Sequence, residues 1–498
     1  MKKPRLGIAA GNELGASAAV EVASAGGNAV DACLAAAIMG WVAEPFFASI
    51  GGSGFITVRA PDGAVAVFDG NNSMPYTAPA QPGQGLKRVY LEYSNGMYTG
   101  IGGGSVAVPG ILAAAYKAWE RHGAIEWAAL FQPAIRAARD GFPFPRSSDY
   151  YLSETWRRIW ARYPGARALF GEEEPMRQGE TLVQSELAES LEQVAQKGPD
   201  TFYRGELADE IVESIAADGG FLRVDDLDRY RAEVRAPIVT DVFGWRIESN
   251  PPPAVGGVVL THMLSLLQTA KLDEPLDRLR SIVEAERAAI GYHADHYQEP
   301  GEIAGGHEEA LARALRRTGS PETTHASAAD ADGYTCAITE SNGYGSGLVI
   351  HGMLFNNTLG EEELNPLGVH RLPPGSRCHS NQAPTVACGP DSSIVVSLGS
   401  PGAERIVGAI AQTFIGIAVD GLPLAEAVSA PRAHLAQKPD GPLMCFEPGL
   451  PGEELGYTPR PYDDLHMFFG AVQAASVTAD GEVDAACDPR RSTASALV

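Results

Sequence analysis

Apolar residues along this chain recur with two periods, one typical of helices and one typical of strands. Residues 29–42 are apolar on nearly every face, and Asn28 stands three residues before Asp31, which is a helix-start pattern. This predicts a helix buried on all sides. Apolar positions at three- and four-residue spacing predict further helices over residues 111–121, 130–139, 187–196, 207–217, 257–267, 279–297 and about 404–419.

Alternation with a period of two predicts β-hairpins. Residues 54–59 and 64–68 alternate around Pro61-Asp62-Gly63. A second hairpin is predicted from Thr323 to Thr339, because Asp332-Gly333 lies between two alternating flanks and Asp-Gly is a strong hairpin signal. Residues 393–398 predict a buried strand, so helices and strands are mixed along the whole chain.

The segment before the second hairpin has a different composition. Residues 301–322 are rich in Gly, Glu and Arg and end in Ser320-Pro321-Glu322, where the proline biases the preceding residue to an extended conformation. A polar tether is therefore predicted to run into Thr323, the first residue of a buried strand. An ordinary strand start after a linker is one interpretation of this junction.

A second interpretation is chemical. A threonine hydroxyl is a weak nucleophile without a base beside it, and an N-terminal threonine carries its own base in the free α-amino group. That group has a pKa of about 7.7 to 8.0, so it accepts the hydroxyl proton near neutral pH. The chemistry requires cleavage of the chain between Glu322 and Thr323.

Composition limits the partners and the environment. The formal net charge of −24 and pI of about 4.9 exclude nucleic acid or an anionic membrane surface as a favoured partner. No run of apolar residues is long enough to predict a membrane span. Six scattered cysteines and a start without a sustained apolar segment predict a reduced, cytoplasmic protein. His293 and His296 stand three apart without a third ligand nearby, so neither a metal nor another cofactor is predicted.

Another candidate for chemistry follows the strand over residues 393–398. Gly399-Ser400-Pro401-Gly402-Ala403 lies between that strand and a predicted helix. Backbone N–H groups at a helix start have no partner within the helix, so those of Gly402 and Ala403 are suited to stabilising an oxyanion. A purely structural strand-to-helix turn is the alternative.

Taken together, these motifs resemble the γ-glutamyltransferase family of N-terminal-nucleophile hydrolases. The resemblance spans nearly the whole chain in family order. It is carried by residues 26–32, 49–55, 250–253, 322–325 with the 332–333 turn, 345–347, 355–357, 399–402 and 487–490. It implies a four-layer αββα fold of the α/β (α+β) class. It also implies self-cleavage before Thr323 into a large part (1–322) and a small part (323–498), which stay together as a heterodimer and one αββα unit.

The resemblance also implies roles for individual residues. Thr323 matches the nucleophile, Ser341 a second hydroxyl that hydrogen-bonds it, and Gly402 with Ala403 the oxyanion pair. Residues implied to contact the small-molecule substrate are Asn342, Thr358, Glu361 (with Glu362 as an alternative carboxylate for a substrate amine), Ser380 and Asn381. His325 and His379 are predicted to have core or loop roles.

The match fails at the acyl-group pocket. γ-Glutamyl enzymes of this family clamp the substrate α-carboxylate with an arginine shortly after the segment that matches residues 68–71, assisted by a Ser-Ser pair. This chain has no basic residue there before Lys87, and it has Ser380-Asn381 in place of the pair. A lysine ammonium does not readily replace a bidentate guanidinium. The sequence therefore predicts retained catalysis with a non-standard acyl specificity.

The resulting prediction is a self-processing hydrolase or acyltransferase made as a zymogen. One alternative is a C–C bond hydrolase that removes an oxalyl-type group in alkylproline antibiotic biosynthesis, as homologues in this family are associated with that step. An alternative from a different class is a catalytically silent binding or scaffold homologue, which the intact Thr323, Ser341 and Gly-Ser-Pro-Gly turn argue against.

Overall fold

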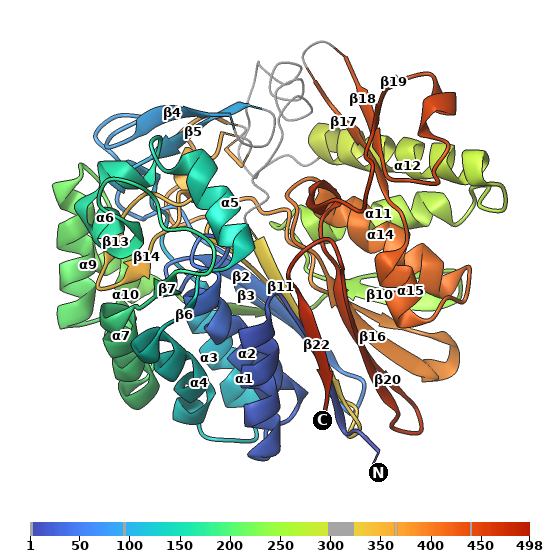
Figure 1. Cartoon of the computed structure of the whole chain (residues 1–498), viewed down its shortest axis with the longest axis horizontal. Helices are drawn as coiled ribbons and strands as arrows, with labels where there is room; N and C mark the ends of the chain where they lie inside the picture. The colour runs from blue at the N-terminus through green and yellow to red at the C-terminus, as the bar shows by residue number, and fades with distance from the viewer. Residues whose placement is uncertain (1–2, 93–95, 297–322, 363, 366, 439–440) are drawn as a thin grey trace.

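Two β-sheets lie face to face between two layers of helices (Figure 1). The computed structural model describes residues 3–498 except 93–95, 297–322, 363, 366 and 439–440, so the predicted tether over 301–322 lies outside the described residues. The four-layer αββα arrangement predicted from the sequence is confirmed.

The first sheet has seven strands in the order β22-β1-β11-β12-β2-β3-β8. Their bounds are Ala494–Leu497, Leu6–Ala10, Thr323–Asp330, Thr335–Ser341, Ser53–Arg59, Val65–Gly70 and Glu233–Arg235. All neighbouring pairs are antiparallel. Both predicted hairpins, β2–β3 and β11–β12, are confirmed.

The second sheet has six strands in the order β21-β20-β16-β15-β10-β9. Their bounds are Val483–Cys487, Gln473–Thr478, Ile394–Gly399, Thr385–Cys388, Trp245–Ser249 and Ile238–Val242. Strand β11 packs against β16 and β20 across the gap between the sheets. Residues on both sides of the predicted cleavage point therefore contribute strands to both sheets.

Helices cover the outer face of each sheet (Figure 1). The helical layer outside the first sheet contains α1, α2, α3 and α4, which span Glu13–Ser24, Ala29–Ala43, Ile111–His122 and Trp127–Asp140. The layer outside the second contains α11, α12, α14 and α15, which span Gly256–Leu267, Pro275–His296, Arg405–Ala418 and Leu424–Ser429. Separate apolar clusters fill the space between each sheet and its helices.

The remaining elements are shorter or peripheral. They are β4 (Lys87–Leu91), β5 (Met97–Ile101), β6 (Phe142–Pro143), α5 (Arg146–Thr155), α6 (Pro164–Phe170), β7 (Thr181–Leu182), α7 (Ser185–Lys197), α8 (Asp200–Tyr203), α9 (Glu206–Ala217), α10 (Val224–Arg229), β13 (Val349–Ile350), β14 (Met353–Leu354), β17 (Ala433–Ala436), β18 (Leu443–Phe446) and β19 (Thr458–Pro461). 3₁₀ turns cover Gly103–Ser105, Trp160–Arg162, Thr358–Gly360, Pro390–Ser392, Gly452–Leu455 and Met467–Phe469.

Helix α2 is the buried helix that the apolar pattern predicts. Every one of its residues is buried, and the Asn28 side chain caps its first turn while Asp31 accepts a hydrogen bond from the Asn28 backbone. The helix packs against β11 and β12 and ends at Ala43, with Glu44 as its C-cap. Its C-terminal end therefore lies directly behind the strand that begins with Thr323.

Candidate functional site

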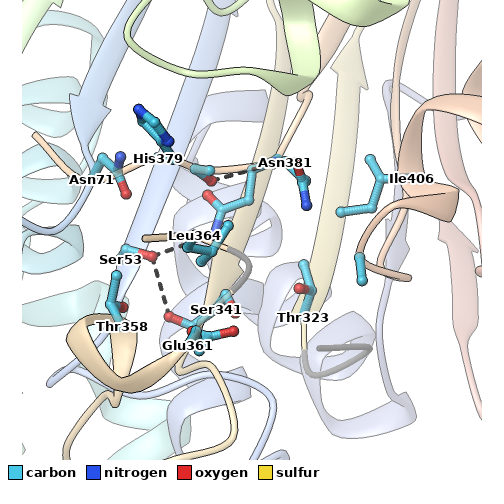
Figure 2. A pocket seen from close by; sticks show the side chains of 13 residues that line it. Ser53, Asn71, Thr323, Ser341, Thr358, Glu361, Leu364, His379, Asn381 and Ile406 are labelled. Carbon is cyan, nitrogen blue, oxygen red and sulfur yellow. Dashed lines mark hydrogen bonds between the residues drawn. The ribbon is translucent and has the colours of Figure 1, made fainter. Parts of the chain in front are cut away.

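Thr323 begins β11 in the interior of the molecule. Its side chain is 4% exposed, and it lies directly opposite Ser341 of β12 in the hairpin register. Its backbone carbonyl accepts a hydrogen bond of 3.1 Å from Arg491 Nη1. Thr323 and Ser341 both line a cavity of about 40 Å³ (Figure 2). The structure thus brings together the two hydroxyls that the sequence predicts to act as a pair.

The turn between β16 and α14 reaches the same cavity. Ala403 lines it, and Gly402 and Ala403 both have positive φ angles, of 131° and 56°. Neither backbone N–H donates to another residue in the described part of the chain. Consecutive amides left unpaired in such a turn form an anion-binding concavity. Ser400 Oγ accepts from Ala471 N at 3.0 Å and so ties the turn to the start of β20.

A non-glycine residue with left-handed backbone geometry is uncommon, and Ala403 is one. Such a conformation costs about 1 to 2 kcal/mol per residue. Strained backbone of this kind is concentrated at functional sites. The conformation of Ala403 therefore favours the predicted oxyanion role over a purely structural role for this turn.

Five more predicted residues lie in or beside this cavity. Thr358, Glu361, Ser380 and Asn381 line it, and Asn342 does not (Figure 2). Asn342 is fully buried beside Ser341, and its side-chain amide has no hydrogen-bond partner among the described residues. Gly402 is the other predicted residue outside the lining.

Glu361 and Glu362 differ in position. Glu361 is 3% exposed and lines the cavity. Glu362 instead forms an ion pair with Arg88, with Nε and Oε1 2.8 Å apart. Asn365 Nδ2 donates to the backbone carbonyls of Thr358 and Glu361 at 2.7 and 2.8 Å, which holds this loop in place.

Among the described residues, the cavity wall contains no arginine or lysine. Glu361 carries the one carboxylate, and His379 is the other titratable side chain in the lining of the described structure.

Lys87 is bound elsewhere, with Nζ 2.5 Å from Asp218 Oδ1 and 3.2 Å from Tyr163 OH. Arg377 lies behind Asn71, to whose carbonyl it donates at 3.2 Å. Arg377 also faces the buried carboxylate of Asp69 at 3.6 Å.

Several lining residues are not apparent from the sequence. Ser53, Asn71, Leu364, His379, Gln382 and Ile406 complete the wall. His379 was predicted to have a core or loop role, and the structure places it in the cavity wall. Ser53 and Asn71 lie at the ends of β2 and β3, in segments that the family resemblance covers. Their position in those segments could have indicated that they belong to the site.

His325 has a structural role, as predicted. Its Nδ1 lies 2.8 Å from Thr339 Oγ1, and its Nε2 lies 2.8 Å from Ser327 Oγ. Burial lowers the pKa of His325 to about 3, so the ring is neutral at physiological pH. It packs between the sheets against Gly399, where a Cβ would lie 2.3 Å from the ring.

The described residues show no metal-binding group of three or more His, Cys, Asp or Glu side chains. The side chains of His293 and His296 lie outside the description. Within the described part of the chain, no helix has both the length and the apolarity needed to cross a bilayer.

Comparison with known proteins identifies the family. The gamma-glutamyltranspeptidase family model matches residues 15–302 and 294–498. The chain belongs to this family. Its members include a glutathione hydrolase proenzyme of Escherichia coli, which is 28% identical over 95% of this chain and 88% of the relative. The glutathione hydrolase proenzyme of Pseudomonas aeruginosa is 30% identical over 97% and 93%.

Other relatives of this chain are named acylases rather than glutathione hydrolases. The Acylase ACY 1 proenzyme of Pseudomonas sp. (strain SE83) is 31% identical over 90% of this chain and 86% of the relative. Among solved structures, a cephalosporin acylase from Bacillus halodurans matches with a TM-score of 0.83 at 24% identity, over 100% of this chain and 96% of the other. The match shows that the two proteins share a fold.

Proposed function

We propose that this protein is a self-processing hydrolase or acyltransferase that uses Thr323 as its nucleophile and accepts acyl groups without the α-carboxylate of a γ-glutamyl substrate. One observation carries the proposal. The hydroxyl pair and the turn with unpaired amides meet at one cavity, and the wall of that cavity in the described structure contains no arginine or lysine to hold a carboxylate.

Self-processing would begin with attack of the Thr323 hydroxyl oxygen on the carbonyl carbon of Glu322. The peptide C–N bond breaks, the hydroxyl proton passes to the departing nitrogen, and an ester links Glu322 to the Thr323 side chain. Water then hydrolyses the ester. The products are a carboxylate on Glu322 and a Thr323 with a free hydroxyl and a free α-amine.

Turnover would follow the same course with an external substrate. The α-amine of Thr323 takes the hydroxyl proton as the oxygen adds to the substrate carbonyl. The backbone amides of Gly402 and Ala403 donate to the resulting oxyanion. The leaving amine departs with a proton, and water or an acceptor amine then releases the acyl group from the threonine ester. Ser341 lies opposite Thr323 and orients its hydroxyl.

Acyl selectivity would follow from the charges of the wall. Glu361 favours an ammonium group on the substrate, since opposite charges attract strongly where water is excluded. A substrate carboxylate would be desolvated without an arginine or lysine beside it, and burying an uncompensated charge is costly. An acyl group with an amine and without a carboxylate therefore suits this wall.

Matched p-nitroanilides test the proposal. γ-Glutamyl-p-nitroanilide carries both charged groups, 4-aminobutanoyl-p-nitroanilide lacks the carboxylate, and glutaryl-p-nitroanilide lacks the amine. We expect the 4-aminobutanoyl compound to have a kcat/KM at least about tenfold above the other two, which corresponds to about 1.4 kcal/mol of transition-state free energy. A tenfold preference for the γ-glutamyl compound would contradict the acyl specificity proposed.

The mass of the freshly purified protein under denaturing conditions tests the nucleophile. Two fragments, the smaller beginning Thr-Thr-His-Ala, are expected, whereas Thr323→Ala should remain one chain of 498 residues. A chain that stays intact would favour the binding or scaffold alternative. Cleavage of Thr323→Ala at the same bond would show that another residue is the nucleophile.

Two finer expectations stay predictions. The C–C bond hydrolase alternative in antibiotic biosynthesis would use the same nucleophile and oxyanion site, and release of oxalate from a 2-oxo-acid-bearing substrate would test it. A cytoplasmic location is proposed from the scattered cysteines alone, and cell fractionation would test it.

A further inference from the structure

The hairpin that carries Thr323 has two chemically different faces. Thr323 lies opposite Ser341, and the next pair in the register is Thr324 opposite Glu340. Because successive side chains of a strand point to opposite faces of the sheet, the first pair faces the cavity and the second faces helix α2. The contacts of the second pair with α2 therefore help to fix the position of the first pair.

Two carboxyl groups meet on the face toward α2. Thr324 Oγ1 donates to Glu44 Oε2 at 2.8 Å, and Trp41 Nε1 donates to Glu340 Oε2 at 2.7 Å. Asn12 Nδ2 also donates to Glu44 Oε2, at 2.9 Å. Glu44 is 7% exposed and Glu340 is 1% exposed. Both carboxyls are thus held in fixed positions away from water.

The two carboxyls approach each other at Gly40, which has no side chain to separate them. A Cβ on Gly40 would lie 3.2 Å from Glu340 Oε1 and 3.7 Å from Glu44 Oε2. Glu340 Oε1 has no hydrogen-bond partner among the described residues. Two ionised carboxylates that face the same buried point would repel each other, which favours retention of one proton by the pair.

The surrounding groups decide where the proton resides. Burial raises the pKa of Glu340 well above its usual value, and the charge of Glu44 raises it further, against the hydrogen bond from Trp41. Burial also raises the pKa of Glu44, but hydrogen bonds from Thr324 and Asn12 and the charge of Arg491 oppose that effect. The thiol of Cys33 also faces Glu340, and burial raises its pKa well above the usual value, so it is neutral. Glu340 is the better site for the proton.

Arg491 links this acid pair to the nucleophile. Its Nη1 donates to the backbone carbonyl of Thr323 at 3.1 Å, and its positive charge stabilises ionised Glu44. Glu44 therefore acts on the first residue of β11 through Arg491 and on the second through the Thr324 hydroxyl. With Glu340 neutral, the one negative charge on Glu44 balances the one positive charge on Arg491.

We propose that Glu340 is a neutral carboxylic acid which, paired with ionised Glu44, is a positioning residue for Thr323. The proposal rests on the proposed function of Thr323 as the nucleophile. Loss of the Glu340 proton would place a second negative charge against Glu44 and pull that carboxylate away from Thr324. The start of β11 would then shift, and Thr323 would lose its alignment with the bond that it attacks.

Self-cleavage of newly made precursor tests this inference without knowledge of the substrate. Precursor from cell-free synthesis is diluted into buffers from about pH 6 to pH 10, and the conversion to two fragments is followed on denaturing gels. The free α-amine does not exist before cleavage, so its titration does not enter the profile. Wild type and Glu340→Gln are compared, because glutamine keeps the shape and remains neutral at every pH.

We expect Glu340→Gln to cleave at the wild-type rate near pH 7 and to become faster than wild type at alkaline pH. Above the pKa of Glu340 the ratio of the two rates should rise by about tenfold per pH unit. Superimposable pH profiles would overturn the proposal, as would a tenfold slower Glu340→Gln at pH 7. Failure of the wild type itself to cleave would instead refute Thr323 as the nucleophile.

A second pair of variants separates positioning from general destabilisation. Thr324→Val removes the hydroxyl that donates to Glu44, and Thr339→Val removes a buried hydroxyl of the same hairpin that contacts His325. Thr324→Val should slow cleavage about tenfold at all pH values, in line with the effect of a small misplacement of reacting groups. Thr339→Val should cleave at the wild-type rate. Equal rates for the two variants would contradict the positioning role.

Discussion

The Glu361 carboxylate can be displaced without changing Glu361 itself, through Gly343. A Cβ at Gly343 would lie 2.3 Å from Glu361 Oε1 and 2.4 Å from Asn357 Oδ1, whereas ordinary contacts are 3.4 to 4 Å. The φ angle of Gly343 is +60°, which adds about 1 to 2 kcal/mol of strain for any residue with a side chain. Asn357 is held by hydrogen bonds of 3.0 Å to Thr99 Oγ1 and to the Gly100 carbonyl. In Gly343→Ala, therefore, the carboxylate of Glu361 has to move, and Asn357 Oδ1 or the backbone at residue 343 has to shift with it.

The size of the effect follows from the displacement. Relief of the contact requires a shift of about 1 Å, and a misplacement of that size in a binding group costs up to about a hundredfold in rate. The measured quantity is the ratio of kcat/KM for 4-aminobutanoyl- and pentanoyl-p-nitroanilide, which have the same length and differ in the terminal ammonium. Gly343→Ala should lower this ratio by about tenfold to a hundredfold.

A ratio is the appropriate measure because Gly343 N also donates to Ser341 Oγ at 3.1 Å, so the absolute rates can change with both substrates. Gly456→Ala is the matched control, since Gly456 has a φ of +79° and nothing within 4 Å of the added Cβ. It carries similar strain without the contact and should keep the wild-type ratio. Retention of the amine preference in Gly343→Ala would refute the assignment of Glu361 as the ammonium-binding group.

Three further predictions concern catalysis and stability. Ser341→Ala should slow self-cleavage of the precursor because it removes the hydroxyl opposite Thr323, and unchanged conversion on denaturing gels would exclude that role. Asp488→Asn should lower the free energy of unfolding by about 3 to 5 kcal/mol in urea titrations, because it leaves Arg432 and Arg490 buried without that carboxylate; they lie 2.7 and 3.0 Å from it. The unfolded chain binds a proton at His325 below about pH 6.5 whereas the folded pKa is about 3, so stability falls as pH drops through that interval. Between pH 7 and pH 5 the wild type should lose about 2 kcal/mol more than His325→Gln, and an equal loss would contradict a buried neutral histidine.

Local patterns were sufficient to predict the elements that carry the site. The Asp332-Gly333 turn and its alternating flanks predicted the β11–β12 hairpin, which pairs from Thr323 with Ser341 onward. The continuous apolar character of residues 29–42 predicted helix α2, all of whose residues are buried. Secondary structure and burial of this kind depend on the spacing of apolar and polar residues, which can be read from a short segment.

The cavity wall could not be read in the same way. Ser53, Asn71 and Gln382 come from three different segments. They converge because β2 pairs with β3 in the first sheet and because Gln382, in the loop before β15, donates to Ser53 Oγ at 3.4 Å. No spacing along the chain encodes that convergence. His379 illustrates the limit, because its neighbours in the sequence show a loop without showing which cavity the loop borders.

The sequence by itself determined the family, the candidate nucleophile and the absence of the expected arginine before Lys87, because each depends on the identity and order of residues. Tertiary structure decided that Lys87 and Arg377 are engaged elsewhere and that Glu361, rather than Glu362, faces the cavity. It also decided that Glu44 meets Glu340 behind Thr323. The charge that a side chain presents to a substrate depends on its burial and its partners, and segments remote in the sequence supply both.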